Sequence, residues 1–132
     1  MSKISLSLLF FASIIFADET LYFSCEAKSL TLNEDGSYEE YKYNRGEKII
    51  ALSINKEAKI VNWDSKRMDF TEDYNKDNIY EFTKYDDIYY LDIRFNGVTG
   101  RSTENMSIKL VDGGRRFYKT EYQCKRSIPL LQ

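Results

Sequence analysis

Hydrophobic and polar residues alternate along most of the chain after residue 18, and turn-forming residues interrupt this pattern roughly every ten positions. Alternation with a period of two is typical of β-strands, because successive side chains of a strand point to opposite faces. Leu21, Phe23, Cys25 and Ala27 share one face of the first such segment. No segment after residue 17 sustains the spacing of an amphipathic helix, so we expect an all-β domain.

The turn residues divide the chain into short alternating segments. Asn96-Gly97 is the strongest signal for a short hairpin, because both residues tolerate the positive φ angles of a tight turn. We expect a small antiparallel up-and-down meander of about eight strands that forms a barrel or a sandwich. The expected strands cover residues 21–28 with an extension at 30–32, then 38–43, 48–54, 59–63, 67–70, 79–85, 88–95, 98–101 with 106–110, and 115–125.

The first 17 residues have the pattern of a cleavable signal peptide. Lys3 precedes an apolar run from Ile4 to Phe16, and Ala17 follows as a small residue at the cleavage position. The run is shorter than the roughly 20 apolar residues of a membrane-spanning helix. We therefore expect residues 1–17 to be removed, and residues 18–132 to form one domain that is secreted or periplasmic.

Two cysteines occur near the two ends of this expected domain, Cys25 and Cys124. In an exported chain such a pair favours a disulfide, since an oxidising compartment allows the bond to persist. A reactive thiol is a poorer interpretation, because the chain has no C-x-x-C spacing and no histidine. The disulfide would join the first strand to the last and would favour a closed sheet.

The charge of the chain does not point to nucleic acid. The formal net charge is −2 at pH 7, with no basic stretch that would bind phosphates or an anionic membrane. An outer-membrane barrel is also disfavoured, because the segments 38–43 and 79–85 carry charges too densely for a lipid-facing surface. We expect a monomer without a membrane span after cleavage, with an unknown protein or small ligand as its partner.

All eleven tyrosines lie in the expected domain. Tyrosine suits a half-buried strand and also a contact surface, since its ring is apolar and its hydroxyl is polar. Neighbouring tyrosines on a strand point to opposite faces, so some of them must be exposed. Arginines beside glycine-containing turns could add cations to such a surface. The candidate binding residues are Tyr38, Tyr41, Tyr43, Tyr89, Tyr90, Arg101, Arg115 and Arg116.

The longest polar interval contains a weak calcium motif. Asp73, Asn75 and Asp77 place oxygen ligands at alternate positions, but Asn78 stands where an EF-hand loop needs glycine, and Lys84 stands where it needs glutamate. We therefore expect neither a metal nor a cofactor. Asn105-Met-Ser107 matches the acceptor pattern for N-glycosylation, which applies only in a eukaryotic source.

Enzymatic activity is not expected. With no histidine in the chain, Ser-His-Asp and Cys-His arrangements are impossible. Carboxylate doublets such as Glu39-Glu40 and Asp86-Asp87 do not form a general acid/base pair by sequence adjacency alone, since neighbours on a strand point to opposite faces.

Tyr122-Gln-Cys124 near the end of the chain resembles small periplasmic inhibitors of lysozyme, in which a Tyr-x-Cys occurs near each end. Near the start, Tyr22-Phe-Ser-Cys25 has one residue more than that pattern. The resemblance implies an antiparallel barrel tied by a disulfide. We expect a non-enzymatic binding protein, with a lysozyme-type hydrolase inhibitor and, for a hollow barrel, a small-ligand carrier as the alternatives.

Overall fold

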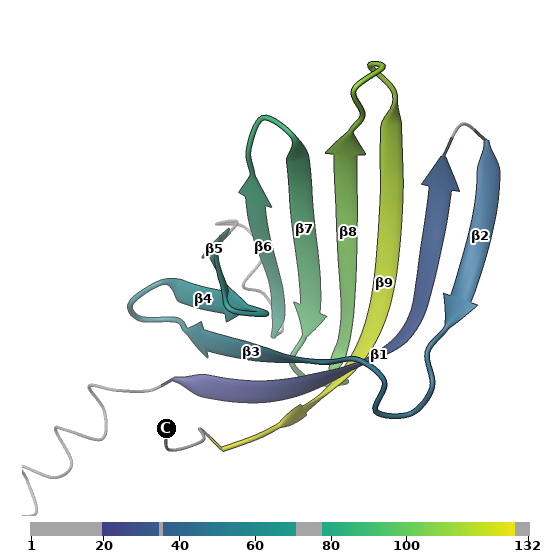
Figure 1. The fold of residues 1–132 in the computed structure, drawn as a ribbon. Coiled ribbons are helices and arrows are strands. Elements are labelled where there is room, and N and C mark those ends of the chain that lie inside the picture. The colour runs from purple at the N-terminus through teal and green to yellow at the C-terminus, as the bar shows by residue number, and fades with distance from the viewer. Residues whose placement is uncertain (1–19, 35, 71–77, 129–132) are drawn as a thin grey trace, which may run out of the picture.

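The computed structural model describes residues 20–34, 36–70 and 78–128 (Figure 1). The expected signal peptide, residues 1–17, and the calcium motif Asp73, Asn75 and Asp77 lie outside these residues. The described chain forms nine strands and no helix. The strands are β1 (Leu21–Glu34), β2 (Ser37–Lys42), β3 (Ile49–Asn55), β4 (Ile60–Trp63), β5 (Lys66–Phe70), β6 (Ile79–Tyr85), β7 (Tyr89–Asn96), β8 (Arg101–Lys109) and β9 (Arg115–Arg126).

Eight of the strands close into an antiparallel barrel, and β2 is an additional strand. Strands β3 to β9 follow one another as a meander, and β1 pairs with both β3 and β9 to complete the ring. The expected antiparallel meander is thereby confirmed, and of the two forms that we expected, barrel and sandwich, the structure has the barrel. In Figure 1, β6 to β9, the second half of β1 and β2 stand upright, while β3 crosses the base of these strands.

A β-bulge at Lys28 divides β1 into two halves. The pairing register with β9 shifts between Ala27 and Ser29, so Lys28 is an extra residue on β1. The first half of β1 pairs with β3, and the second half, from Ser29 onward, pairs with β2. Because one inserted residue reverses the alternation, the inward-facing positions change from odd numbers before the bulge to even numbers after it.

The barrel interior is filled with side chains. Trp63 and Phe82 are fully buried, and each ring makes an edge-to-face contact, Trp63 with Tyr122 at 5.1 Å and Phe82 with Phe70 at 5.6 Å. The packed interior is built from Phe23, Cys25, Ala27, Ile50, Leu52, Ile54, Val61, Trp63, Met68, Tyr80, Phe82, Leu91, Ile93, Phe95, Tyr122 and Cys124.

The disulfide expected from the sequence joins Cys25 of β1 to Cys124 of β9. The two residues are directly opposite in the β1–β9 register, and both side chains are buried. The bond therefore fastens the pair of strands that closes the barrel. No free cysteine occurs among the described residues.

Two turns differ from the prediction. The chain after Asn96-Gly97 does not continue at once as a strand, because the side-chain Oδ1 of Asn96 accepts hydrogen bonds from the amides of Val98 and Thr99. This local bonding lengthens the turn, and β8 begins only at Arg101. Asp64 and Ser65 lie between the strands expected at 59–63 and 67–70, and they form a tight hairpin turn with positive φ angles, so that β5 begins at Lys66.

Candidate functional site

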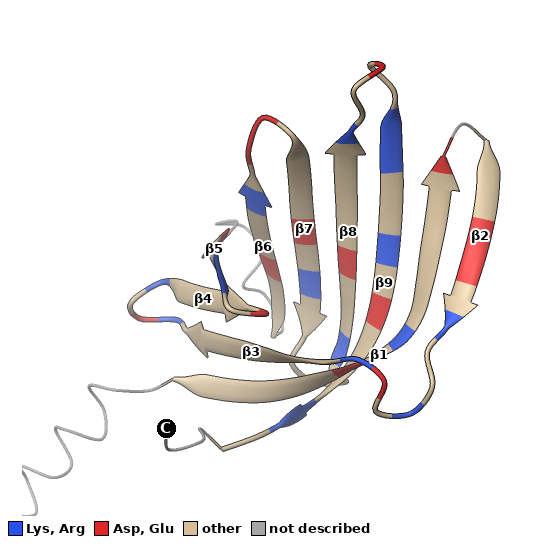
Figure 2. Ribbon diagram, in the orientation of Figure 1, with Lys and Arg blue, Asp and Glu red and all other residues tan. Residues whose placement is uncertain are grey.

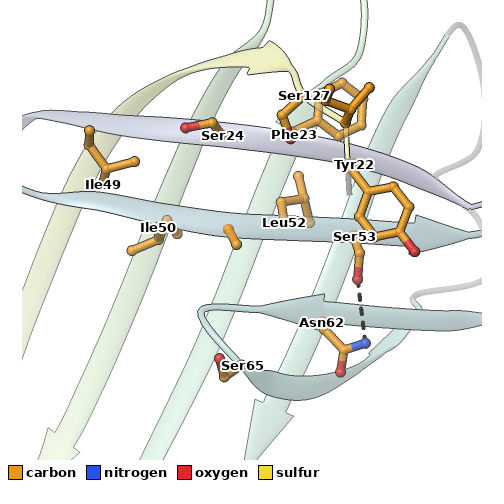
Figure 3. Close-up of a pocket in the computed structure, with 12 residues that line it drawn as sticks. Tyr22, Phe23, Ser24, Ile49, Ile50, Leu52, Ser53, Asn62, Ser65 and Ser127 are labelled. Atoms are coloured by element: carbon orange, nitrogen blue, oxygen red, sulfur yellow. Dashed lines mark hydrogen bonds between the residues drawn. The ribbon is translucent and has the colours of Figure 1, made fainter. Parts of the chain in front are cut away.

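A groove of about 760 Å³ lies on the outer surface of β1, β3 and β4 (Figure 3). Residues of the three strands form its floor, and Ser65 and the segment after β9 form its edges. This volume falls within the range of small-ligand sites, about 300–1,000 Å³. The lining consists of Tyr22, Phe23, Ser24, Ile49, Ile50, Ala51, Leu52, Ser53, Asn62, Ser65, Ser127 and Ile128.

The groove floor is largely apolar because the outer face of β3 carries apolar residues in its first half. Ile50, Leu52 and Ile54 point into the barrel and are buried, whereas Ile49 and Ala51 point outward. A strand with one face in water ordinarily carries polar side chains on that face. Ile49 is instead 57% exposed, and Ile128, at another edge of the groove, is 83% exposed.

None of the described residues that line the groove is charged. This is unusual in a chain of which 30% of the residues are charged. Figure 2 shows β3 and most of β4 without charged residues, while the upright strands carry bands of both signs. The polar groups of the lining are hydroxyls and one amide, and Asn62 Nδ2 donates a 3.4 Å hydrogen bond to Ser53 Oγ. Such a surface suits a neutral ligand that is mainly apolar.

The predicted tyrosines do not form one surface. Tyr38 of β2 and Tyr90 of β7 lie on the outer face, with Tyr38 63% exposed. Tyr41 and Tyr43 lie beside the second half of β1 on the inner face, where the centroids of their rings are 5.0 Å apart in an edge-to-face contact. Tyr89 also faces inward and packs against the core. The alternation argument correctly required some of them to be exposed, but the two faces separate the set.

The predicted arginines are also dispersed. Arg101 begins β8 opposite Gln123, whereas Arg115 and Arg116 begin β9 at the other end of that strand pair. Arg116 Nε and Glu34 Oε2 are 2.9 Å apart in an ion pair, which raises the pKa of the guanidinium. Arg115 lines a small pocket of about 200 Å³ together with residues 85–90, which include Tyr89 and Tyr90.

Two carboxylates share a partly buried region on the outer face of β6 and β7. Glu81 Oε2 accepts a 2.7 Å hydrogen bond from Arg94 Nε. Asp92 Oδ1 is buried without a hydrogen-bond partner among the described residues. Burial raises the pKa of Asp92, the nearby Glu81 raises it further, and Arg94 opposes both effects. Neither carboxylate lines the groove or the small pocket, so neither faces a described ligand space.

A second polar cluster lies inside the barrel. Trp63 Nε1 donates a 2.6 Å hydrogen bond to Glu104 Oε2. The hydroxyls of Ser102 and Tyr122 are buried without a partner in the described part of the chain. Burial is the main reason that the pKa of Tyr122 is strongly raised, and the charge of Glu104 adds to it. These groups face the packed interior, so we assign them a structural role and not a role in binding.

Among the described residues no group of three or more acidic, cysteine or histidine side chains could hold a metal ion. The described chain also contains no helix with the length and apolar character needed to cross a membrane.

The sequence analysis did not identify the groove. One signal was present, since residues 48–54 form the most apolar segment of the expected domain. An antiparallel strand that is apolar at both odd and even positions must expose one apolar face or cover it.

This chain matches no family model, and no curated protein or solved structure is significantly similar to it. The groove and its residues therefore carry the functional argument.

Proposed function

We propose that this protein is an exported, non-enzymatic binding protein that holds a neutral, largely apolar segment of a partner protein in the groove over β1, β3 and β4. The observation that carries the proposal is the uncharged groove of about 760 Å³, with Ile49, Ala51 and Ile128 exposed along it. Contiguous exposed apolar surface of this kind marks interaction sites on soluble proteins.

The bound segment would be held through side chains. β1 and β3 are paired with each other beneath the groove, so their backbone groups are already used in the sheet. Burial of apolar surface against Ile49, Ala51 and Ile128 would supply the affinity. The hydroxyls of Ser24 and Ser53 and the amide of Asn62 would orient the segment, as a few polar groups do in apolar sites.

Export is part of the proposal. The buried Cys25–Cys124 disulfide supports an oxidising, extracellular compartment. The packed core of the barrel also supports binding at the surface rather than inside the barrel.

Replacement of one small residue tests the groove. Ala51→Arg places a long charged side chain on the groove floor at a position that is already exposed, so the fold should persist. We expect this variant to bind the neutral dye Nile red at least ~10-fold more weakly than the unaltered protein. It should also capture fewer partners from the exported protein fraction of the native source.

Asn105→Arg is the matched control, because Asn105 is an exposed strand residue on the outer face of β8, away from the groove lining. It should bind dye and partners like the unaltered protein. Equal binding by Ala51→Arg and the unaltered protein would contradict the proposal.

A lysozyme-type hydrolase inhibitor is the second candidate. The observation that favours it is the closed barrel with its disulfide between the first and last strands, which is the architecture that the Tyr122-Gln-Cys124 resemblance implies. Micromolar purified protein should then slow lysozyme-driven lysis of bacterial cell walls. An unchanged lysis rate would remove this candidate.

A further inference from the structure

One edge of β2 is unpaired within the described chain. β2 pairs with the second half of β1, with Ser37 opposite Glu34 and Lys42 opposite Ser29. No described strand pairs with its other edge, and all six of its residues are exposed. Figure 1 shows β2 at the margin of the upright strands, outside the closed barrel. A free strand edge offers backbone hydrogen-bonding groups to another strand.

The backbone groups that face this edge can be assigned. The amide of Tyr43 donates a 3.0 Å hydrogen bond to the carbonyl oxygen of Lys28 in β1. Because these groups alternate in direction along a strand, those of Tyr41 and Glu39 also face β1. The amides and carbonyls of Glu40 and Lys42 therefore face the free edge.

The side chains of the same two residues carry opposite charges. Glu40 and Lys42 both lie on the outer face of β2, and Lys42 Nζ is 2.8 Å from Glu40 Oε1. Figure 2 shows this acidic and basic pair of bands along β2. Opposite charges two positions apart become complementary when a second copy of the strand runs antiparallel to the first.

We propose that two copies of this chain pair antiparallel through β2, with Tyr41 of each copy on the two-fold axis. Glu40 then lies opposite Lys42 of the second copy, and Lys42 lies opposite its Glu40. Each of these opposed pairs exchanges two backbone hydrogen bonds, because the outward-facing groups of both residues are free to do so. The outer side chains form a square of four alternating charges.

Charge selects this register over its neighbours. In an antiparallel pair of strands, directly opposite residues lie on the same face of the sheet. The two-fold axis of the dimer must therefore pass through one residue of β2 and not between two residues. An axis at Glu40 or at Glu39 would place two glutamates opposite each other, and an axis at Lys42 would oppose two lysines. Like charges in directly opposite positions destabilise a strand pair.

Local bonds limit the length of the new ladder. The Asn44 amide donates a 2.9 Å hydrogen bond to Glu47 Oε1, and the Asn44 carbonyl accepts a 3.0 Å hydrogen bond from the Glu47 amide. The ladder therefore ends near Lys42, and the interface is small. We expect a weak dimer that forms reversibly as the concentration rises.

Charge reversal tests the proposed register. Analytical ultracentrifugation from about 10 µM to about 1 mM should show a monomer–dimer equilibrium in the unaltered protein. Glu40→Lys and Lys42→Glu should each weaken self-association at least ~10-fold, because each opposes like charges. An equimolar mixture of the two variants should form a heterodimer, and the double variant Glu40→Lys/Lys42→Glu should dimerise like the unaltered protein.

A backbone variant gives an independent test. Glu40→Pro removes an amide N–H that the single copy does not use, so the barrel and its disulfide should form normally. It should nevertheless lose the dimer. Glu39→Lys is the matched control, since Glu39 takes no part in the opposed charge pairs, and it should change dimerisation less than Glu40→Lys.

A protein that stays monomeric to about 1 mM would overturn the proposal. A dimer that is indifferent to charge reversal would overturn it as well, because that dimer would use another surface. No residue of β2 lines the groove, so Ala51→Arg should leave dimerisation unchanged and the two proposals can fail separately.

Discussion

The amide of Cys124 donates a 2.7 Å hydrogen bond to the carbonyl oxygen of Gly100. Gly100 has a φ of 79°, and a Cβ atom at this position would collide with the carbonyl oxygen of Cys124. The turn between β7 and β8 therefore rests directly on the strand that carries the disulfide. Only glycine fits this contact, since an L-residue would meet both the unfavourable φ and the backbone of β9.

Gly100→Ala should lower the free energy of unfolding by about 2–4 kcal/mol, because left-handed backbone strain and the collision with Cys124 add together. Urea denaturation would measure the loss. Gly113→Ala is the control, since Gly113 has a φ of 91° but nothing within 4 Å of an added Cβ. Equal losses in the two variants would show that the contact with Cys124 carries no cost.

Removal of the disulfide should reduce stability without changing the topology. The bond links residues that are 99 positions apart, and a loop of this length is worth up to about 4.7 kcal/mol by the chain-entropy argument. We expect Cys25→Ala/Cys124→Ala to lose about 2–5 kcal/mol in urea denaturation. Its far-UV circular dichroism should remain that of a β protein, because the β1–β9 register extends well beyond the two cysteines. A spectrum of an unfolded chain would contradict this expectation.

The hydrogen bond from Trp63 to Glu104 should contribute to the stability of the fold. Glu104→Leu should cost about 1–3 kcal/mol, because the buried indole N–H loses its acceptor. Glu104→Gln should cost less, since its amide oxygen can still accept the hydrogen bond. Trp63 is the only tryptophan of the chain, so its fluorescence follows unfolding directly. An equal loss in both variants would mean that the charge of Glu104 matters more than the hydrogen bond.

The buried carboxylate of Asp92 should lower the stability of the protein at neutral pH. A variant without this carboxylate should not show that part of the pH dependence. Burial raises the pKa of Asp92 in the folded state above its ordinary value of 3.8. The folded state therefore binds this proton more tightly than the unfolded chain does. Stability from this group is present below pH 3.8 and is lost as the pH rises through the raised pKa.

The variant Asp92→Asn should accordingly melt at a higher temperature than the unaltered protein at pH 7. The difference should shrink as the pH falls toward 3.8, where Asp92 becomes protonated. Thermal melts of the two proteins at matched pH values would measure this difference in melting temperature. Because both proteins contain the other carboxylates, the titration of those groups cancels in the difference. A lower melting temperature for Asp92→Asn at pH 7 would show that the Arg94 interaction outweighs burial.

The strands were predictable because alternation encodes both the element and its buried face. Alternation places Tyr118, Thr120, Tyr122 and Cys124 on one face of the last strand, and three of these four side chains are buried in the structure. The turns were less predictable. The side chain of Asn96 bonds to two downstream amides, and a dipeptide signal such as Asn-Gly does not reveal whether such bonds will extend the turn.

The candidate site was harder to predict than the fold. Tyr38 and Tyr41 are close in sequence, but they are three positions apart on β2, so the alternation of the strand places them on different faces. The groove depends on the curvature that brings β1, β3 and β4 beside Ser127 and Ile128, and sequence periodicity contains no information about that approach. A surface of this kind is a tertiary property, whereas strand identity is mainly a local one.

The pairing of β1 with β9 has a consequence for the order of folding. β1 can pair with β2 and β3 early, because both are close to it in sequence. Its pairing with β9, which closes the ring, cannot form until residues 115–126 are available. The hairpins from β3 to β9 can form earlier, since each joins neighbours in sequence. Long-range closure of this kind is slow compared with local pairing. We therefore expect barrel closure to be the late, rate-limiting event. Until then, the edge of β1 that pairs with β9 should remain unpaired.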